Sequence, residues 1–285
     1  MDYVNAKPIE LPVAYDYSEE QATNDLVESL LYGSPSGTPG FSPGSKGDGK
    51  TRPVFLGAPD ASAADAEGVA PAAFGSSNRP FSTARADGAT GSTNKIYPYR
   101  ASGRLFATIN GGSGTCSGSL VKKGIVATAA HCVSKYGANQ LYSNIRFVPG
   151  YKNGQAPYST WAASQVRVLA AYFNGTDPCA TPSIVCKNDV AVITLGAQNG
   201  KYPGTNTGWY GYGWNGFGCT NSGLTHITQI GYPSCLDNGT IMQRNDAQGV
   251  KTASQSDNTV IGSLFLSTNI SAMVNAACAA TPAAC

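Results

Sequence analysis

The chain has 285 residues and a mass of 29.4 kDa, a length that suits one large domain or two small ones. Only 13% of its residues are charged, and its 34 glycines and 17 prolines favour short strands joined by turns over a coiled coil. No apolar run is long enough for a membrane span. The net charge of +2 arises from scattered bases, so the composition also argues against a nucleic-acid partner.

Residues 1–95 differ in composition from the rest of the chain. They hold 12 acidic and 7 basic residues, a net charge of −5, and residues 33–50 are rich in Gly, Ser and Pro, as flexible linkers are. Residues 56–95 carry few large apolar side chains and cannot build a core. We therefore expect a disordered N-terminal leader. The alternative is a removable pro-segment that is cleaved after Arg79, Arg85 or Lys95.

From residue 96 onward, short β-rich runs alternate with turn residues, a pattern typical of an antiparallel barrel or sandwich. The runs that predict strands are Arg104–Ile109, Gly118–Val121, Ile125–Ala129, Ile145–Val148, Gln165–Ala170 and Val190–Leu195. Near the end, apolar residues at helical spacing predict a short C-terminal helix: Ile270, Met273, Val274 and Ala277.

The chain contains eight cysteines, all in its last two thirds, and none forms a Cys-x-x-Cys pair. The even number and this spacing indicate disulfides rather than a metal site, and disulfides imply an oxidising compartment. We expect a secreted protein without a metal or organic cofactor, although the printed sequence does not begin with a signal peptide.

Two segments carry the residue types that acid–base catalysis needs. Small residues precede His131 in Val126–Cys132, and they leave room for a substrate at the imidazole. Asp189 opens the apolar run Val190–Leu195, where its carboxylate would be buried and would require a partner. An aspartate that holds a histidine through Nδ1 leaves Nε2 free to act as a general base.

These segments resemble motifs of the chymotrypsin-fold serine proteases, especially the trypsin-like and glutamyl-endopeptidase-like branch. The matching runs occur in family order over roughly residues 97–260: Cys116-Ser117-Gly118-Ser119-Leu120, Thr128-Ala129-Ala130-His131-Cys132 and Asn188-Asp189-Val190-Ala191-Val192. The resemblance implies an all-β fold of two antiparallel barrels, the first at about 96–196 and the second at about 197–285. It further implies a Cys116–Cys132 disulfide, His131 as general base and acid, and Asp189 as the residue that orients it.

The family's nucleophile motif, Gly-x-Ser-Gly-Gly, does not occur in the sequence. Ser222 fits a turn and Ser119 fits a strand, which leaves Ser263 as the weakly supported candidate nucleophile. We expect an incomplete second barrel, in which a segment near Ser263–Leu266 is missing together with the oxyanion hole. On this interpretation the chain as written has negligible peptidase activity, lower by a factor on the order of 10⁶.

The resemblance thus predicts a serine-type endopeptidase family protein, a monomer that acts on polypeptides. The alternative is a catalytically inactive homologue that acts as a binding protein. A third hypothesis, that the chain is a defective gene product, predicts aggregation, because an open barrel exposes unpaired strand edges.

Overall fold

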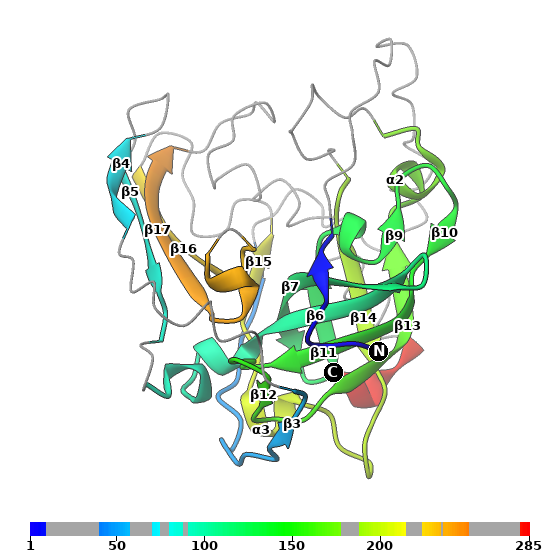
Figure 1. Cartoon of the computed structure of the whole chain (residues 1–285), viewed down its shortest axis with the longest axis horizontal. Helices are drawn as coiled ribbons and strands as arrows, with labels where there is room; N and C mark the ends of the chain where they lie inside the picture. Colours follow the sequence, from blue (N-terminus) through cyan, green and yellow to red (C-terminus); the bar gives the residue numbers. More distant parts are fainter. Residues whose placement is uncertain are drawn as a thin grey trace.

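A computed structural model gives the structure of the protein. It describes residues 1–9, 40–57, 70–74, 80–87, 91–177, 188–214, 224–234, 236–250 and 280–285. Over these residues the fold is mostly β-structure (Figure 1), as the sequence predicts, and the two α-helices are short, α2 (Ala170–Asn174) and α3 (Gly204–Thr207).

Six antiparallel strands close into a barrel, on the right in Figure 1. They are β6 (Ser102–Ile109), β7 (Gly112–Lys122), β8 (Ile125–Thr128), β11 (Ser143–Pro149), β13 (Trp161–Val168) and β14 (Ala191–Leu195). The order β7-β6-β11-β13-β14-β8 returns to β7, because the second half of β7 pairs with β8. The double pairing of β7 leaves its first half, from Gly112 to Gly118, with one edge that no barrel strand covers.

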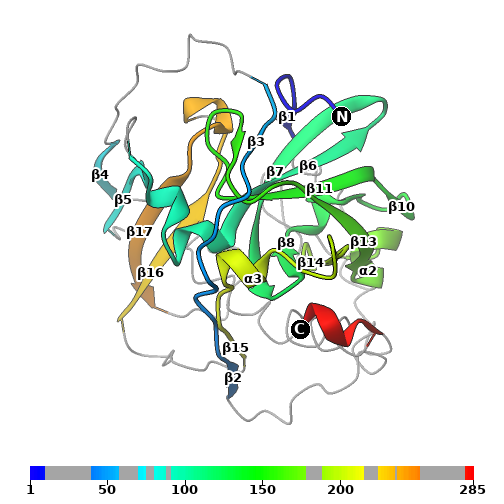
Figure 2. The same ribbon diagram turned by 90° about the horizontal axis from the view of Figure 1, so that it is seen from below.

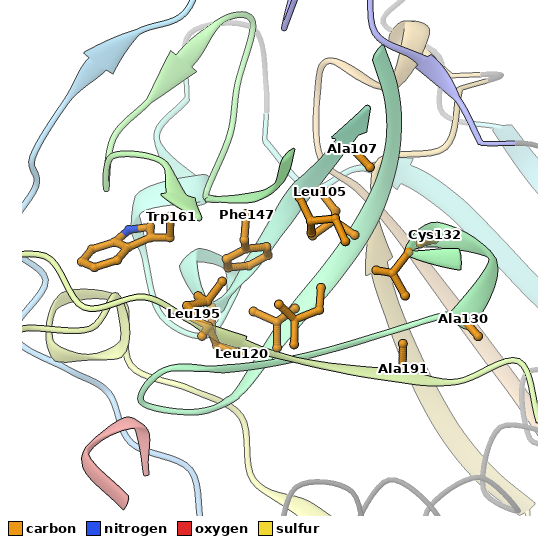
Figure 3. Close-up of a cluster of buried hydrophobic side chains, with 14 of the residues drawn as sticks. Leu105, Ala107, Leu120, Ala130, Cys132, Phe147, Trp161, Ala191 and Leu195 are labelled. Atoms are coloured by element: carbon orange, nitrogen blue, oxygen red, sulfur yellow. The ribbon is translucent and has the colours of Figure 1, made fainter. Parts of the chain in front are cut away.

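The predicted strands of this first barrel are confirmed, with shifted ends. The strand predicted at Gln165–Ala170 runs from Trp161 to Val168. It ends there because Ala170 begins α2, which is followed by Gly175 with a positive φ of 80°. The apolar side chains inside the barrel form one core (Figure 3), in which Leu105, Phe147 and Trp161 are almost fully buried. Burial of such side chains is the main favourable contribution to folding.

A second sheet lies beside the barrel, on the left in Figure 1. Its order is β16-β17-β5-β4, with β16 (Leu224–Gly231), β17 (Gln243–Val250), β5 (Pro80–Arg85) and β4 (Ala70–Phe74). The end of β5 is held by a buried ion pair, in which Arg85 donates from Nε and Nη2 to the carboxylate of Asp237. An apolar cluster that includes Phe106, Tyr151 and Met242 packs the barrel against this sheet.

The described parts of residues 1–95 pair with the rest of the chain. β1 (Lys7–Pro8) adds to β7, β2 (Gly40–Ser42) pairs with β15 (Tyr212–Trp214), and β3 (Val54–Phe55) pairs with β12 (Gln155–Ala156). Residues 40–57 run as a strap along the lower face, between the two sheets (Figure 2). Backbone hydrogen bonds also hold the strap, among them those from Ser45 to Trp209 and from Gly49 to Asn206.

Short elements complete the described chain. They are β9 (Ser134–Lys135), β10 (Gln140–Leu141) and the 3-10 helices at Thr93–Lys95, Tyr99–Ala101, Ala130–Cys132, Asp237–Gly239 and Pro282–Ala284. The predicted C-terminal helix and the segment near Ser263–Leu266 lie outside the described residues, so the expected gap in the second barrel is not resolved by the fold.

Candidate active site

His131 lies where barrel strand β8 ends, in the 3-10 turn Ala130–Cys132. The next residue, Cys132, forms a disulfide with Cys116 of β7, as the family resemblance implies. This bond fixes the backbone after the histidine to a barrel strand. The imidazole itself remains partly open, since 15% of the His131 side chain is exposed.

Asp189 makes two contacts with His131. Its Oδ1 accepts a hydrogen bond from the His131 backbone N–H at 2.7 Å, and its Oδ2 lies 2.6 Å from the imidazole Nδ1. The carboxylate is fully buried. Because an ionised carboxylate only accepts hydrogen bonds, Nδ1 is the donor in this contact, and in a neutral imidazole Nε2 then has a free lone pair. The arrangement therefore orients an imidazole whose Nε2 can accept a proton.

A second buried aspartate holds the turn that precedes Asp189. Asp177 accepts hydrogen bonds from the backbone N–H of Asn188 at 2.6 Å and from its side-chain amide at 2.9 Å. Its neighbourhood is fixed in turn by Tyr136, whose hydroxyl donates to the Asp177 carbonyl oxygen at 2.6 Å. The sequence analysis missed Asp177, since nothing in its local sequence distinguishes it from a loop residue.

A pocket of about 470 Å³ opens beside His131. The β6–β7 turn forms one wall, the segment Gln140–Ser143 forms another, and Lys135 is the charged residue among those that line it. Tyr172 of α2 also lines the pocket; its hydroxyl is buried and has no hydrogen-bond partner among the described residues. Burial raises the pKa of the Tyr172 hydroxyl, so this side chain is neutral at physiological pH.

The described residues do not include the candidate nucleophile Ser263, and Ser222 lies outside them as well. Ser119 is a strand residue of β7, as predicted. Ser134 lines the pocket beside His131, but its hydroxyl donates to the Ala130 carbonyl oxygen at 3.1 Å. The second histidine, His226, lies in strand β16 opposite Gln248 of β17.

The ligand atoms of Cys116, His131 and Cys132 lie within 4.8 Å of one another. Such a cluster would suit a soft metal ion if the cysteines were thiolates. Here the two sulfur atoms are bonded to each other, so the cluster is a disulfide next to an imidazole.

A closed antiparallel six-stranded barrel, a second β-sheet and a His–Asp pair at the barrel's edge define a chymotrypsin-type serine protease fold. A family model described as Trypsin matches residues 90–269, more than half of the chain. The chain therefore belongs to the trypsin family, and the expected resemblance is confirmed.

Solved structures similar to this chain include three proteases. The protease Anisep from Arthrobacter nicotinovorans is 28% identical with a TM-score of 0.44, and the match covers 54% of this chain and 65% of that one. A thermostable serine protease, AL20, from an extremophilic microorganism has 22% identity, a TM-score of 0.43 and coverage of 56% and 69%. A Glu endopeptidase in complex with MPD has 20% identity, a TM-score of 0.40 and coverage of 56% and 65%. The chain thus spans slightly less than two thirds of Anisep. A search of curated protein sequences gave no match.

None of the helices in the described ranges has the length and the apolar character that crossing a bilayer requires.

Proposed function

We propose that this protein is a serine-type endopeptidase that hydrolyses peptide bonds of polypeptides through an acyl-enzyme. The observation that carries the proposal is the double contact between Asp189 and His131. A buried carboxylate that binds both the backbone and the ring of one histidine fixes the direction of Nε2. A general base needs this fixed direction, whereas a structural histidine does not.

In the proposed reaction, Nε2 of His131 takes the proton of a serine hydroxyl as the serine oxygen attacks the substrate carbonyl carbon. Asp189 stabilises the imidazolium that forms, without taking its proton. The imidazolium then gives this proton to the leaving amine as the carbon–nitrogen bond breaks. A water molecule repeats the sequence on the acyl-enzyme and releases the carboxylic acid together with the free serine.

Ser263 stays the candidate nucleophile, and the oxyanion-hole donors are unassigned. Because the sequence lacks Gly-x-Ser-Gly-Gly, we expect the 285-residue chain by itself to hydrolyse peptides negligibly. The Cys116–Cys132 disulfide supports our proposal that the protein is secreted into an oxidising compartment. We also propose that it is a monomer and that residues 1–95 form the pro-segment of a zymogen.

The test is labelling of the protein from its native source with a fluorophosphonate, which reacts with activated serines, and mapping of the modified peptide. A labelled serine, whether Ser263 or one on a peptide absent from this sequence, supports the proposal. The label should fall to background in a His131→Ala variant of the same protein. Folded, intact protein that takes no label would contradict it.

The missing nucleophile motif favours a second candidate function, that of an inactive homologue that binds a polypeptide partner. This alternative predicts a soluble, secreted chain of 29.4 kDa that resists the fluorophosphonate.

A further inference from the structure

The first nine residues of the chain lie on the uncovered edge of β7. Lys7 pairs with Gly114 and Pro8 with Thr115 in parallel register, and the Ile9 N–H donates to the Thr115 carbonyl oxygen at 3.1 Å. Figure 1 shows β1 as the dark blue arrow beside β7. Edge strands present unpaired backbone groups that bind extended peptides by adding a strand. In this chain, residues 7–9 satisfy those groups.

Three further contacts anchor the same segment. The ring of Tyr3 packs edge-on against Phe106, with ring centroids 4.9 Å apart. The Asp2 backbone N–H donates to the Ser113 hydroxyl at 3.1 Å. Ile9 packs against the barrel core. An apolar contact near the start of the segment, together with backbone pairing and a second apolar contact at its end, distinguishes this arrangement from a chance contact of a polar tail.

A glycine of β7 makes room for this strand. A Cβ at Gly114 would stand 2.8 Å from Ile9 Cγ1 and 2.8 Å from Ile109 Cδ1, so both isoleucine side chains approach this glycine. Ile109 also lines the pocket beside His131. Ile9 and a residue that lines the pocket thus approach the same glycine.

The occupied edge adjoins the imidazole. Thr115, which accepts the hydrogen bond from Ile9, is followed by Cys116, whose Sγ lies within 4.8 Å of a ring nitrogen of His131. The position of Thr115 is itself fixed, because its hydroxyl accepts a hydrogen bond at 2.7 Å from the buried side chain of Arg104. An extended polypeptide that passes His131 on this side would use the same backbone groups of β7.

We propose that residues 1–9 are a blocking strand, which fills a polypeptide-binding edge of β7 beside His131 and competes there with extended polypeptides. This inference rests on the proposed function for its consequence, that release of the strand raises peptidase activity. The binding edge itself requires no catalysis. Because the blocking strand is tethered, its effective concentration is in the millimolar range, so a modest intrinsic affinity keeps the edge occupied.

The test uses two full-chain variants. Ile9→Asp puts a charge into the half-buried contact with the barrel core and should release the strand. Phe55→Asp adds the same charge to β3, where Phe55 is 60% exposed, and is the matched control.

The probe is a fluorescent synthetic peptide with the sequence of residues 1–12, and its binding is followed by fluorescence anisotropy. We expect it to bind the Ile9→Asp variant about tenfold more tightly than the unmodified chain or the control, since its edge is free. Hydrogen exchange of residues 112–118 should be faster only in the Ile9→Asp variant.

Equal affinity for all three proteins, or no binding to the Ile9→Asp variant up to about 1 mM peptide, would overturn the proposal, because a tethered strand needs an affinity of that order. Where the unmodified protein is an active peptidase, turnover of a denatured polypeptide that does not rise in the Ile9→Asp variant would also overturn it. Failure of the proposed function has a different signature. The fluorophosphonate label is then absent from the protein of the native source, while the peptide still discriminates between Ile9→Asp and Phe55→Asp.

Discussion

Asn188 donates two hydrogen bonds to the carboxylate of Asp177, from its backbone at 2.6 Å and from its side chain at 2.9 Å, although the two residues are 11 positions apart. Asn188 is the neighbour of Asp189, which in turn holds His131. Asp177 is thus a positioning residue, because it acts on the imidazole only through the turn that carries Asp189. Asp177 lies shortly after the end of α2 and Asn188 shortly before the start of β14, so their contact links these two elements.

Substitution of Asp177 by alanine should loosen that turn. The Asn188 N–H would lose its acceptor in a part-buried place, which costs about 1–3 kcal/mol. We expect a lower midpoint of urea unfolding and faster hydrogen exchange at Asn188–Val190. The control is Asp48→Ala, which removes another part-buried Asp–Asn contact, from Asn206 to Asp48, on the strap of residues 40–57. Equal effects of the two variants on exchange at Asn188–Val190 would contradict the positioning role.

The substitution Asp189→Asn should preserve the fold and remove the acceptor that keeps the proton on Nδ1 of His131. In the enzyme with its nucleophile, labelling by fluorophosphonate and peptide hydrolysis should both fall by about 10⁴. Asp246→Asn is a matched control, because Asp246 pairs with Arg244 on β17 and is more exposed. A variant at Asp189 that keeps full reactivity would show that His131 does not depend on this carboxylate.

Removal of the Cys116–Cys132 disulfide should destabilise the barrel and the turn that carries His131. The bond closes a loop with a sequence separation of 16, for which chain entropy predicts about 3 kcal/mol. The double variant Cys116→Ala/Cys132→Ala should unfold at lower urea concentration. A loss of stability below about 0.5 kcal/mol would mean that strand pairing alone fixes this turn.

Buried tyrosines predict a loss of stability at alkaline pH. Burial raises the pKa of Tyr210 to about 12 and raises the pKa of Tyr232 well above its ordinary value. In the unfolded chain tyrosines ionise near pH 10, while the folded protein keeps these protons. Stability should therefore be full below about pH 10 and fall as the pH rises from about 10 to 12.

This effect is measured as the change with pH in the midpoint of urea unfolding. The variant Tyr232→Phe removes one such group and should flatten the decline above pH 10. At neutral pH it should cost about 1 kcal/mol, since the Tyr232 hydroxyl donates to the Tyr151 carbonyl oxygen. If the stability of the Tyr232→Phe variant declined above pH 10 as steeply as that of the unmodified protein, Tyr232 would not be a cause of the decline.

Limited proteolysis distinguishes the cleavage sites suggested by the sequence. Arg85 is held in the buried ion pair with Asp237, whereas Lys95 is exposed and precedes Ile96, which is 57% exposed. We expect added trypsin to cut after Lys95 well before it cuts after Arg85, as mass spectrometry of the fragments would show. The nicked protein should elute as one species until denaturant is added, because β1, β2, β3 and β5 pair with strands beyond residue 95. Immediate separation of the fragments would contradict this pairing.

The sequence predicts the barrel well because each of its strands contains a local apolar run bounded by turn residues. It also predicts the pairing of His131 with Asp189, since a buried carboxylate needs a partner and the chain has only two histidines. The pairing of β1 with β7 could not be predicted in this way. Residues 7–9 are too short to show a periodic pattern, and their partner strand is more than 100 residues away.

Asp177 and Arg85 illustrate the same limit. Each reads as an ordinary polar residue in its own segment, and each is buried only because a distant segment supplies its partner, Asn188 in one case and Asp237 in the other. The composition of residues 1–95 gives no sign of the strand pairing that their described parts make. Composition counts apolar side chains, whereas the strap of residues 40–57 is held mainly by backbone hydrogen bonds to strands from elsewhere in the chain.

The central claim is that Asp189 holds the proton on Nδ1 of His131 and leaves Nε2 free as a base. Proton NMR of the chain tests it directly, because a short hydrogen bond from an imidazole N–H to a buried carboxylate moves that proton far downfield. We predict one such resonance, assigned to His131 by its loss in His131→Ala, which is also lost in Asp189→Asn and retained in the His226→Ala control. Its absence from the folded, unmodified protein, or its persistence in the Asp189→Asn variant, would contradict the account.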